Sequence, residues 1–97
     1  MQIITVVEGK VPFSKAKELE ANFTLAKKEP LPSGLVSTAL LRNNKTPDVY
    51  RIQTVWESFE ALEKMRSSTG TPKAIALFQN VGGNPSVGIY ELVDVIP

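Results

Sequence analysis

The residues best suited to chemistry in this sequence lie in one short stretch, from Tyr50 to Trp56. Tyr50, Ile52, Thr54 and Trp56 recur at every second position in a run rich in β-branched and aromatic side chains, which is typical of a strand. That spacing puts a phenol, a hydroxyl and an indole on one face, where they could line a pocket for an aromatic molecule. We therefore take Tyr50, Thr54 and Trp56 as candidate binding residues.

Each of these residues also has an ordinary structural role. A tryptophan at a strand end packs in the core of most proteins that have one, here against Phe59 or Leu62. Tyr50 could simply reach solvent at the start of its strand. The two interpretations of Trp56, core residue or pocket wall, both stay open at this point.

Two ionisable residues are weaker candidates. Glu91, in the last predicted strand, could act as a general base if buried, because burial raises the pKa of a carboxyl; otherwise it would accept hydrogen bonds at an interface. Arg66 either lies over the pocket or belongs to a solvated helix end. The sequence therefore offers no well-placed base, and the catalytic residue stays unassigned.

The residue types that are missing exclude several functions. The chain has no cysteine and no histidine, so a Cys/His zinc site, a catalytic triad with an imidazole and a haem held by a proximal histidine are excluded within one chain. The carboxylates show no ligand-like clustering. We expect that any activity requires no metal, no haem and no other cofactor.

The charge pattern and the hydropathy limit the partners. Eleven basic and ten acidic residues give a net charge of +1 and are scattered along the chain, so neither nucleic acid nor membrane is an expected partner. No stretch approaches the ~20 apolar residues of a membrane span, and the N-terminus has no basic region of a signal peptide. We expect a cytoplasmic protein.

The elements that would position these side chains follow from hydrophobic periodicity. We predict strands at 3–7, 35–42, 50–56 and 87–95, with a hairpin at 43–48. Helices are predicted from Ser14 to before Pro30, from Ser58 to Arg66 with Phe59 on its apolar stripe, and from the Thr71 cap onward. The result is one α+β domain over residues 1–97, a ferredoxin-like βαββαβ unit with an extra short helix.

The predicted sheet is apolar on both faces, although the helices can cover only one. Arg51 and Gln53 alternate with the candidate site residues and would point to the other face. A second copy related by a two-fold axis is the simplest cover for that face, because homodimers dominate among oligomers. We therefore predict a homodimer.

The motif TVWESFEAL, from Thr54 to Leu62, resembles the antibiotic biosynthesis monooxygenase (ABM) domain family. The resemblance implies a dimeric α/β barrel with a pocket between sheet and helices, which the family's tryptophan, here Trp56, faces in catalytic members. The substrate-binding residues expected on this basis are Trp56, Tyr50, Thr54, Val7, Phe23 and Phe59.

The resemblance leaves more than one function open. Some members are cofactor-independent monooxygenases of polycyclic phenols or quinols, and others cleave haem with a histidine on the helix after the tryptophan and an asparagine on the first strand. This sequence has no histidine and has Val6 and Val7 where the asparagine would lie, which argues against haem degradation. We expect a protein that binds a small apolar or aromatic molecule, either a cofactor-independent monooxygenase or a non-catalytic binding or regulatory module.

Overall fold

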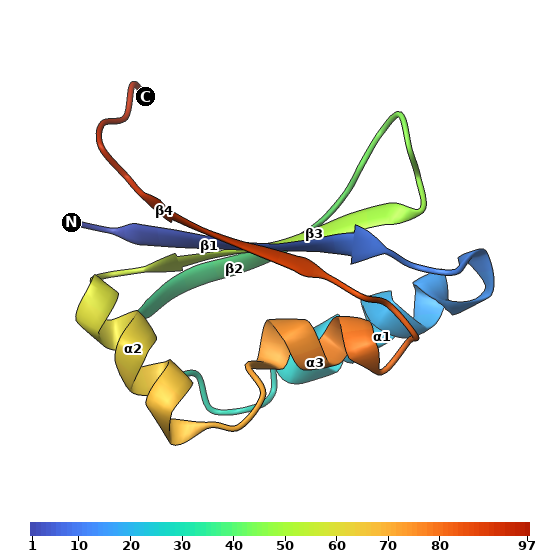
Figure 1. The fold of residues 1–97 in the computed structure, drawn as a ribbon, viewed down its shortest axis with the longest axis horizontal. Coiled ribbons are helices and arrows are strands. Elements are labelled where there is room, and N and C mark those ends of the chain that lie inside the picture. Colours follow the sequence, from blue (N-terminus) through green and yellow to red (C-terminus); the bar gives the residue numbers. More distant parts are fainter.

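The computed structural model describes residues 1–97 and forms one antiparallel sheet with all its helices on one face (Figure 1). The sheet has the order β2-β3-β1-β4 and consists of β1 (Ile3–Lys10), β2 (Leu35–Arg42), β3 (Val49–Trp56) and β4 (Ser86–Glu91). The helical elements are the 3₁₀ turn η1 (Phe13–Lys15), α1 (Ala16–Ala26), α2 (Phe59–Ser68) and α3 (Lys73–Gln79). The predicted α+β, ferredoxin-like fold with an extra short helix is therefore confirmed.

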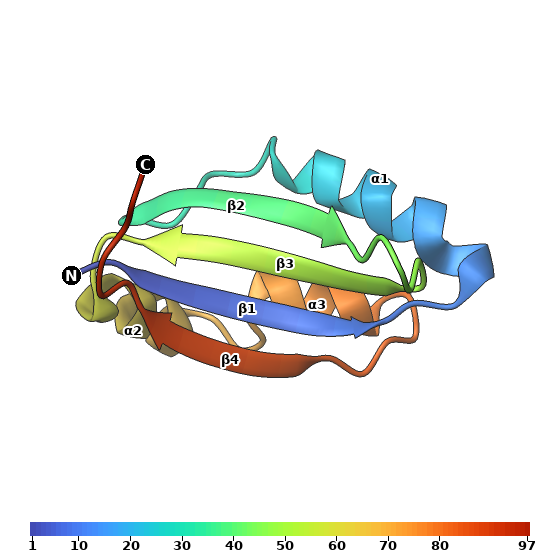
Figure 2. The same cartoon turned by 90° about the horizontal axis from the view of Figure 1, so that it is seen from above.

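Strand β3 has the predicted alternation. Tyr50, Ile52, Thr54 and Trp56 are all buried on the helix-facing side, whereas Arg51 is exposed on the other side. β3 is central because it pairs with β1 along its whole length and with β2 on the other edge (Figure 2). The β2 pairing shifts register between Leu35 and Ser37, which inserts Val36 as an extra residue in this edge strand.

The helix starts were predicted with mixed success. Ser58 is the N-cap of α2, and its hydroxyl accepts a hydrogen bond from the Ala61 amide at 3.1 Å. The Ser14 cap was wrong, because the chain first makes a tight turn in which the Lys15 amide donates to the Pro12 carbonyl at 2.8 Å. The Thr71 cap was also wrong: α3 begins one residue later, with Pro72 at its N-cap position.

The last strand is shorter than predicted. It ends at Glu91, and only one more backbone bond follows, from the Leu92 amide to the Gln2 carbonyl at 2.9 Å. β4 is an edge strand whose sole neighbour, β1, begins at Ile3, so residues after 92 have no strand to pair with. Val93, Val95 and Ile96 are consequently exposed.

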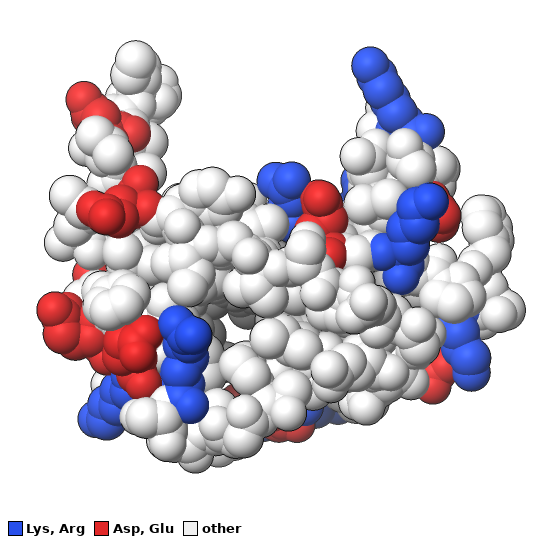
Figure 3. Space-filling model, viewed as in Figure 1, with Lys and Arg blue, Asp and Glu red and all other residues white.

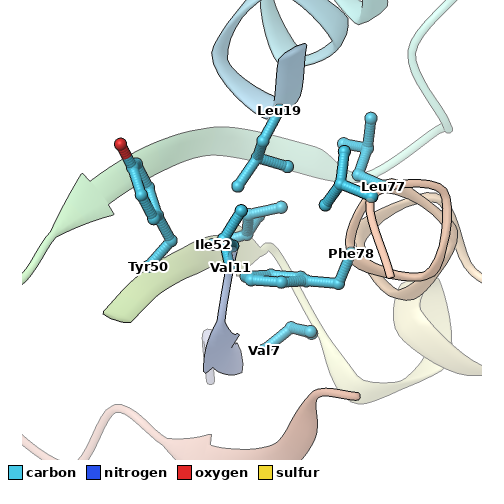
Figure 4. Close-up of a cluster of buried hydrophobic side chains, with 8 residues drawn as sticks. Val7, Val11, Leu19, Tyr50, Ile52, Leu77 and Phe78 are labelled. Carbon is cyan, nitrogen blue, oxygen red and sulfur yellow. The ribbon is translucent and has the colours of Figure 1, made fainter. Parts of the chain in front are cut away.

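The buried side chains form two clusters under the sheet instead of one continuous core. The larger joins β1 and β3 to α1 and α3 (Figure 4). The smaller contains Ile3, Trp56 and Leu62, with Met65 packed against it. Phe59 was expected on this apolar stripe, but its side chain is 48 % exposed because α2 has only just begun beyond the end of β3. No helix in the structure is both long and apolar enough to cross a membrane.

Candidate functional site

A cleft of about 440 Å³ lies between the sheet and the helices, at the boundary of the two core clusters. Its wall on the sheet side comes from β1 and β4, and its wall on the other side comes from α2, α3 and the segment that joins them. The space-filling view shows a hollow between these layers on the β4 side (Figure 3). The lining residues are Thr5, Val7, Leu62, Met65, Arg66, Gly70, Pro72, Ile75, Val87 and Ile89.

The cleft exists because the two helices after β3 diverge. α2 ends at Ser68, and residues 69–72 turn the chain away before α3 starts at Lys73. Leu62 on α2 packs against Ile3 and Trp56, whereas Leu77 and Phe78 on α3 pack with Val7 and Ile52. Two separate anchoring points leave the sheet between them uncovered by helix (Figure 1).

A row of threonine hydroxyls crosses the sheet at this boundary. Thr38, Thr54 and Thr5 are direct neighbours on β2, β3 and β1. The Thr38 and Thr54 hydroxyl oxygens lie 3.0 Å apart and share a hydrogen bond. The indole N–H of Trp56 donates to the Thr5 hydroxyl oxygen at 3.2 Å. These polar groups separate the two apolar clusters and put one hydroxyl, that of Thr5, in the wall of the cleft.

The six side chains expected to bind substrate do not lie together. Val7 lines the cleft, and Trp56, 3 % exposed, is linked to the cleft through the hydroxyl of Thr5. Thr54 is buried beside Thr5, and its hydroxyl shares a hydrogen bond with the hydroxyl of Thr38. The remaining three lie elsewhere: Tyr50 and Phe23 in the larger core cluster and Phe59 on the exposed start of α2.

Of the two ionisable candidates, Arg66 lies at the cleft and Glu91 does not. Arg66 is in the cleft wall and is the one charged residue there. Its guanidinium pairs with the Glu63 carboxylate at 3.1 Å, and both side chains are about half exposed (48%/48%), so the pair is weak and can rearrange around a ligand. Glu91 is exposed at the end of the edge strand. The condition for Glu91 as a general base, burial, is therefore not met.

Most of the cleft wall, Thr5 above all, was not predicted from the sequence. Thr5 is the one polar residue among Ile3, Ile4, Val6 and Val7. It shares the face of Val7 by the period of a strand. A lone hydroxyl in an apolar strand was the available signal, since a buried hydroxyl needs a hydrogen-bond partner.

Tyr50 has an environment of its own, at the far end of β3 from Trp56. Its ring packs in the larger cluster, and its hydroxyl points away from the other labelled side chains (Figure 4). The hydroxyl donates to a Glu20 carboxylate oxygen at 2.6 Å. Burial raises the pKa of the Tyr50 hydroxyl above its ordinary value of 10.0; the bond to Glu20 raises it further, and Arg42 acts in the opposite direction.

We expect this raised pKa to make the fold sensitive to alkali. Above about pH 10 the unfolded chain releases the Tyr50 proton while the folded chain still holds it, so the free energy of unfolding falls as pH rises. Urea unfolding between pH 8 and 11 should show a smaller fall for Tyr50→Phe than for the parent. Equal slopes for the two proteins would contradict the assignment.

Comparison with known proteins shows which solved structures the chain resembles. No protein-family sequence model and no curated protein matches it. A solved structure from Caulobacter crescentus CB15, assigned as an antibiotic biosynthesis monooxygenase, is 26% identical with a TM-score of 0.72, over 96% of this chain and 91% of that one. The chain therefore has the fold of this structure over nearly its whole length.

Two further structures with this fold differ in their described activities. A single-residue variant of SnoaB, a cofactor-independent oxygenase from Streptomyces nogalater, has a TM-score of 0.72 at 18% identity and covers 99% of this chain and 97% of its own. A haem-degrading protein from Mycobacterium tuberculosis has a TM-score of 0.71 at 26% identity over 100% of both chains. The ABM fold thus accommodates both chemistries, and the residues of the cleft must decide between them.

The cleft of this protein does not suit a haem group. Haem iron is held in proteins by histidine, cysteine, methionine or tyrosine side chains. The lining contains one of these types, Met65, and no aromatic residue. No histidine exists in the chain to act as a proximal ligand. We derive no haem chemistry for this protein.

Proposed function

We propose that this chain, acting as one ABM domain over residues 1–97, binds a small apolar or aromatic molecule in the cleft and oxidises it as a cofactor-independent monooxygenase. The observation that carries the proposal is the lining: apolar side chains, one hydroxyl and one guanidinium, in a cleft of about 440 Å³. Such a wall suits a phenolic or quinol substrate with an apolar ring system. The structural similarity to a cofactor-independent oxygenase supports the reaction class. A cytoplasmic location stays an expectation from the sequence.

The residues present can promote such a reaction by binding and charge placement. Apolar walls from Leu62, Ile75 and Ile89 exclude water around the ring. The guanidinium of Arg66 favours the phenolate over the phenol, and the phenolate gives up an electron to dioxygen more readily. For a phenol whose keto tautomer has a CH₂ group, one oxygen atom becomes the new carbonyl oxygen. The other leaves as water with the two hydrogens, and the substrate supplies all four electrons.

Oxygen uptake with a panel of phenols whose keto tautomer has a CH₂ group tests the proposal. We expect uptake well above the rate in buffer, with one dioxygen consumed and one of its oxygen atoms incorporated per carbonyl formed, whereas simple oxidation to a quinone would incorporate no oxygen and release hydrogen peroxide. Arg66→Gln should lower the rate by about tenfold, the effect of one charge-assisted hydrogen bond. Lys64→Gln removes a positive charge from the same helix but outside the cleft and should leave the rate unchanged. Uptake at the buffer rate for every phenol of the panel would refute the oxygenase.

A second function, binding without catalysis, is favoured by one observation. The lining contains no carboxylate and no imidazole, so it has no side chain suited to take up a substrate proton at neutral pH. A protein that retains its ligand but consumes no oxygen would be a binding or regulatory module. Measuring binding and oxygen uptake on the same molecules separates the two.

We also propose that the chain is a homodimer joined through the face of the sheet that no helix covers, which we call the open face. Ile4 and Val6 on β1, Val55 on β3, Leu41 on β2 and Tyr90 on β4 give this face an apolar surface. Glu8 and Arg51, neighbours in the register, form an ion pair at 3.0 Å on it. The surface between the hairpin and the C-terminal segment is mostly uncharged (Figure 3). A second copy is the partner that fits an apolar face of this extent.

A further inference from the structure

We infer that the Thr5 hydroxyl is the specificity determinant of the cleft: Trp56 holds it as a hydrogen-bond donor, so the ligand is an aromatic molecule with a carbonyl or phenolate oxygen. This inference rests on the proposed ligand site and adds the group that recognises the oxygen of the ligand.

The direction of the Trp56–Thr5 hydrogen bond is fixed by chemistry. An indole N–H can only donate, whereas a hydroxyl can donate one proton and accept two bonds. The bond of 3.2 Å therefore uses the oxygen of Thr5 as acceptor. Trp56 is 3 % exposed, so its N–H depends on this bond for a partner.

The proton of the Thr5 hydroxyl is left without an acceptor in the protein. The neighbouring hydroxyl, on Thr54, is engaged with Thr38 at 3.0 Å. The bond from Trp56 is the one hydrogen bond that the Thr5 side chain makes. Since Thr5 is only partly buried and lines the cleft, its proton is available to whatever occupies that space.

The rest of the wall makes this donor selective. Val7, Leu62, Ile75, Val87 and Ile89 offer no polar group. Arg66, the other polar side chain there, is also a donor. A ligand with an apolar body and oxygen acceptors satisfies both, whereas a ligand whose polar group is an ammonium has no acceptor for either donor and loses affinity for that reason.

Matched pairs of probes test the inference. The first pair is 2-methyl-1,4-naphthoquinone and 2-methylnaphthalene, and the second is phenanthrenequinone and phenanthrene; within each pair the two molecules share one carbon skeleton, and two C–H groups of the hydrocarbon are carbonyl groups in the quinone. Equilibrium dialysis should show tighter binding of the quinone in at least one pair, by about tenfold, which corresponds to one neutral hydrogen bond. Thr5→Val keeps the shape and should reduce this preference strongly without weakening the hydrocarbon, whereas Thr5→Ser should retain it.

Two more variants separate donation from packing. Thr24→Val removes a threonine hydroxyl on α1, outside both the cleft and the row, and should keep the preference. Trp56→Phe keeps an aromatic ring and removes the N–H, so the Thr5 hydroxyl is free to turn and the preference should shrink. The carbonyl stretch of the bound quinone should lie at lower frequency in the parent than in Thr5→Val.

Each outcome is decisive. If the quinones and hydrocarbons bind equally, or if Thr5→Val keeps both the preference and the carbonyl frequency of the parent, the inference is wrong while the ligand site stands. If no member of either pair binds, the proposed ligand site fails and the inference with it.

Discussion

Gly34→Ala is expected to destabilise the fold by about 2–5 kcal/mol, from backbone strain and overpacking together. Gly34 has φ +85°, in the left-handed region that side chains with a Cβ avoid. An added Cβ would overlap the Cβ of Ala61 on α2 and lie 3.3 Å from Glu57. The Gly34 carbonyl also accepts the Glu57 amide at 2.9 Å, so the loop before β2 cannot move away without losing this bond.

Two other glycines separate these causes. Gly82 has φ +79° but open space around it, so Gly82→Ala should cost only the strain, about 1 kcal/mol. Gly70 has neither a positive φ nor a neighbour within 4 Å, and Gly70→Ala should be close to neutral. Urea unfolding followed by the emission of Trp56, whose cluster includes Ala61, measures all three. If Gly34→Ala lowers the free energy of unfolding no more than Gly82→Ala does, the loop at Gly34 does not pack as closely against α2 as the structure indicates.

Val6→Glu should convert the proposed dimer into a monomer. Val6 lies on the open face between Gln53 and Gly88 in the register. In an isologous interface each substitution occurs twice, and each copy would bury a carboxylate with no partner. We expect the dissociation constant to rise by about a thousandfold or more, which corresponds to about 4 kcal/mol.

Light scattering across a concentration series measures this change. The parent should scatter as a dimer of a 10.6 kDa chain at micromolar concentration, with an interface on the order of 2,000 Å² in total. Leu25→Glu makes the same kind of substitution at a residue of α1 that is 57% exposed, and should leave the dimer intact. A monomeric parent, or a Val6 variant as dimeric as the parent, would disprove the open-face interface.

Local patterns predicted the elements of this fold well where one physical cause dominated. The alternation from Tyr50 to Trp56 and the Ser58 cap depend on neighbours in sequence, and both are confirmed. The length of β4 depends on where β1 begins, because an edge strand ends with its only partner. The predicted Ser14 cap was wrong because the chain forms the 3₁₀ turn η1, with Pro12 at its N-cap position, before α1 begins.

The candidate site was harder to predict because residues on one face of a strand are not necessarily close together. Tyr50 and Trp56 share a face of β3, but six residues of strand separate them by roughly 20 Å. They consequently belong to different core clusters. Only the packing of α2 and α3 decides which part of the face stays open, and that packing involves contacts far apart in the sequence, such as Leu62 with Ile3.

The extra residue in β2 has a consequence for how the protein behaves at high concentration. β2 and β4 are the free edges of the sheet, and a free edge can recruit strands from other molecules and start fibrils. At Val36 the regular spacing of amide and carbonyl groups along β2 is broken. A foreign strand could therefore pair with only part of this edge, which disfavours fibril growth from β2 even though the strand itself is rich in leucine and valine.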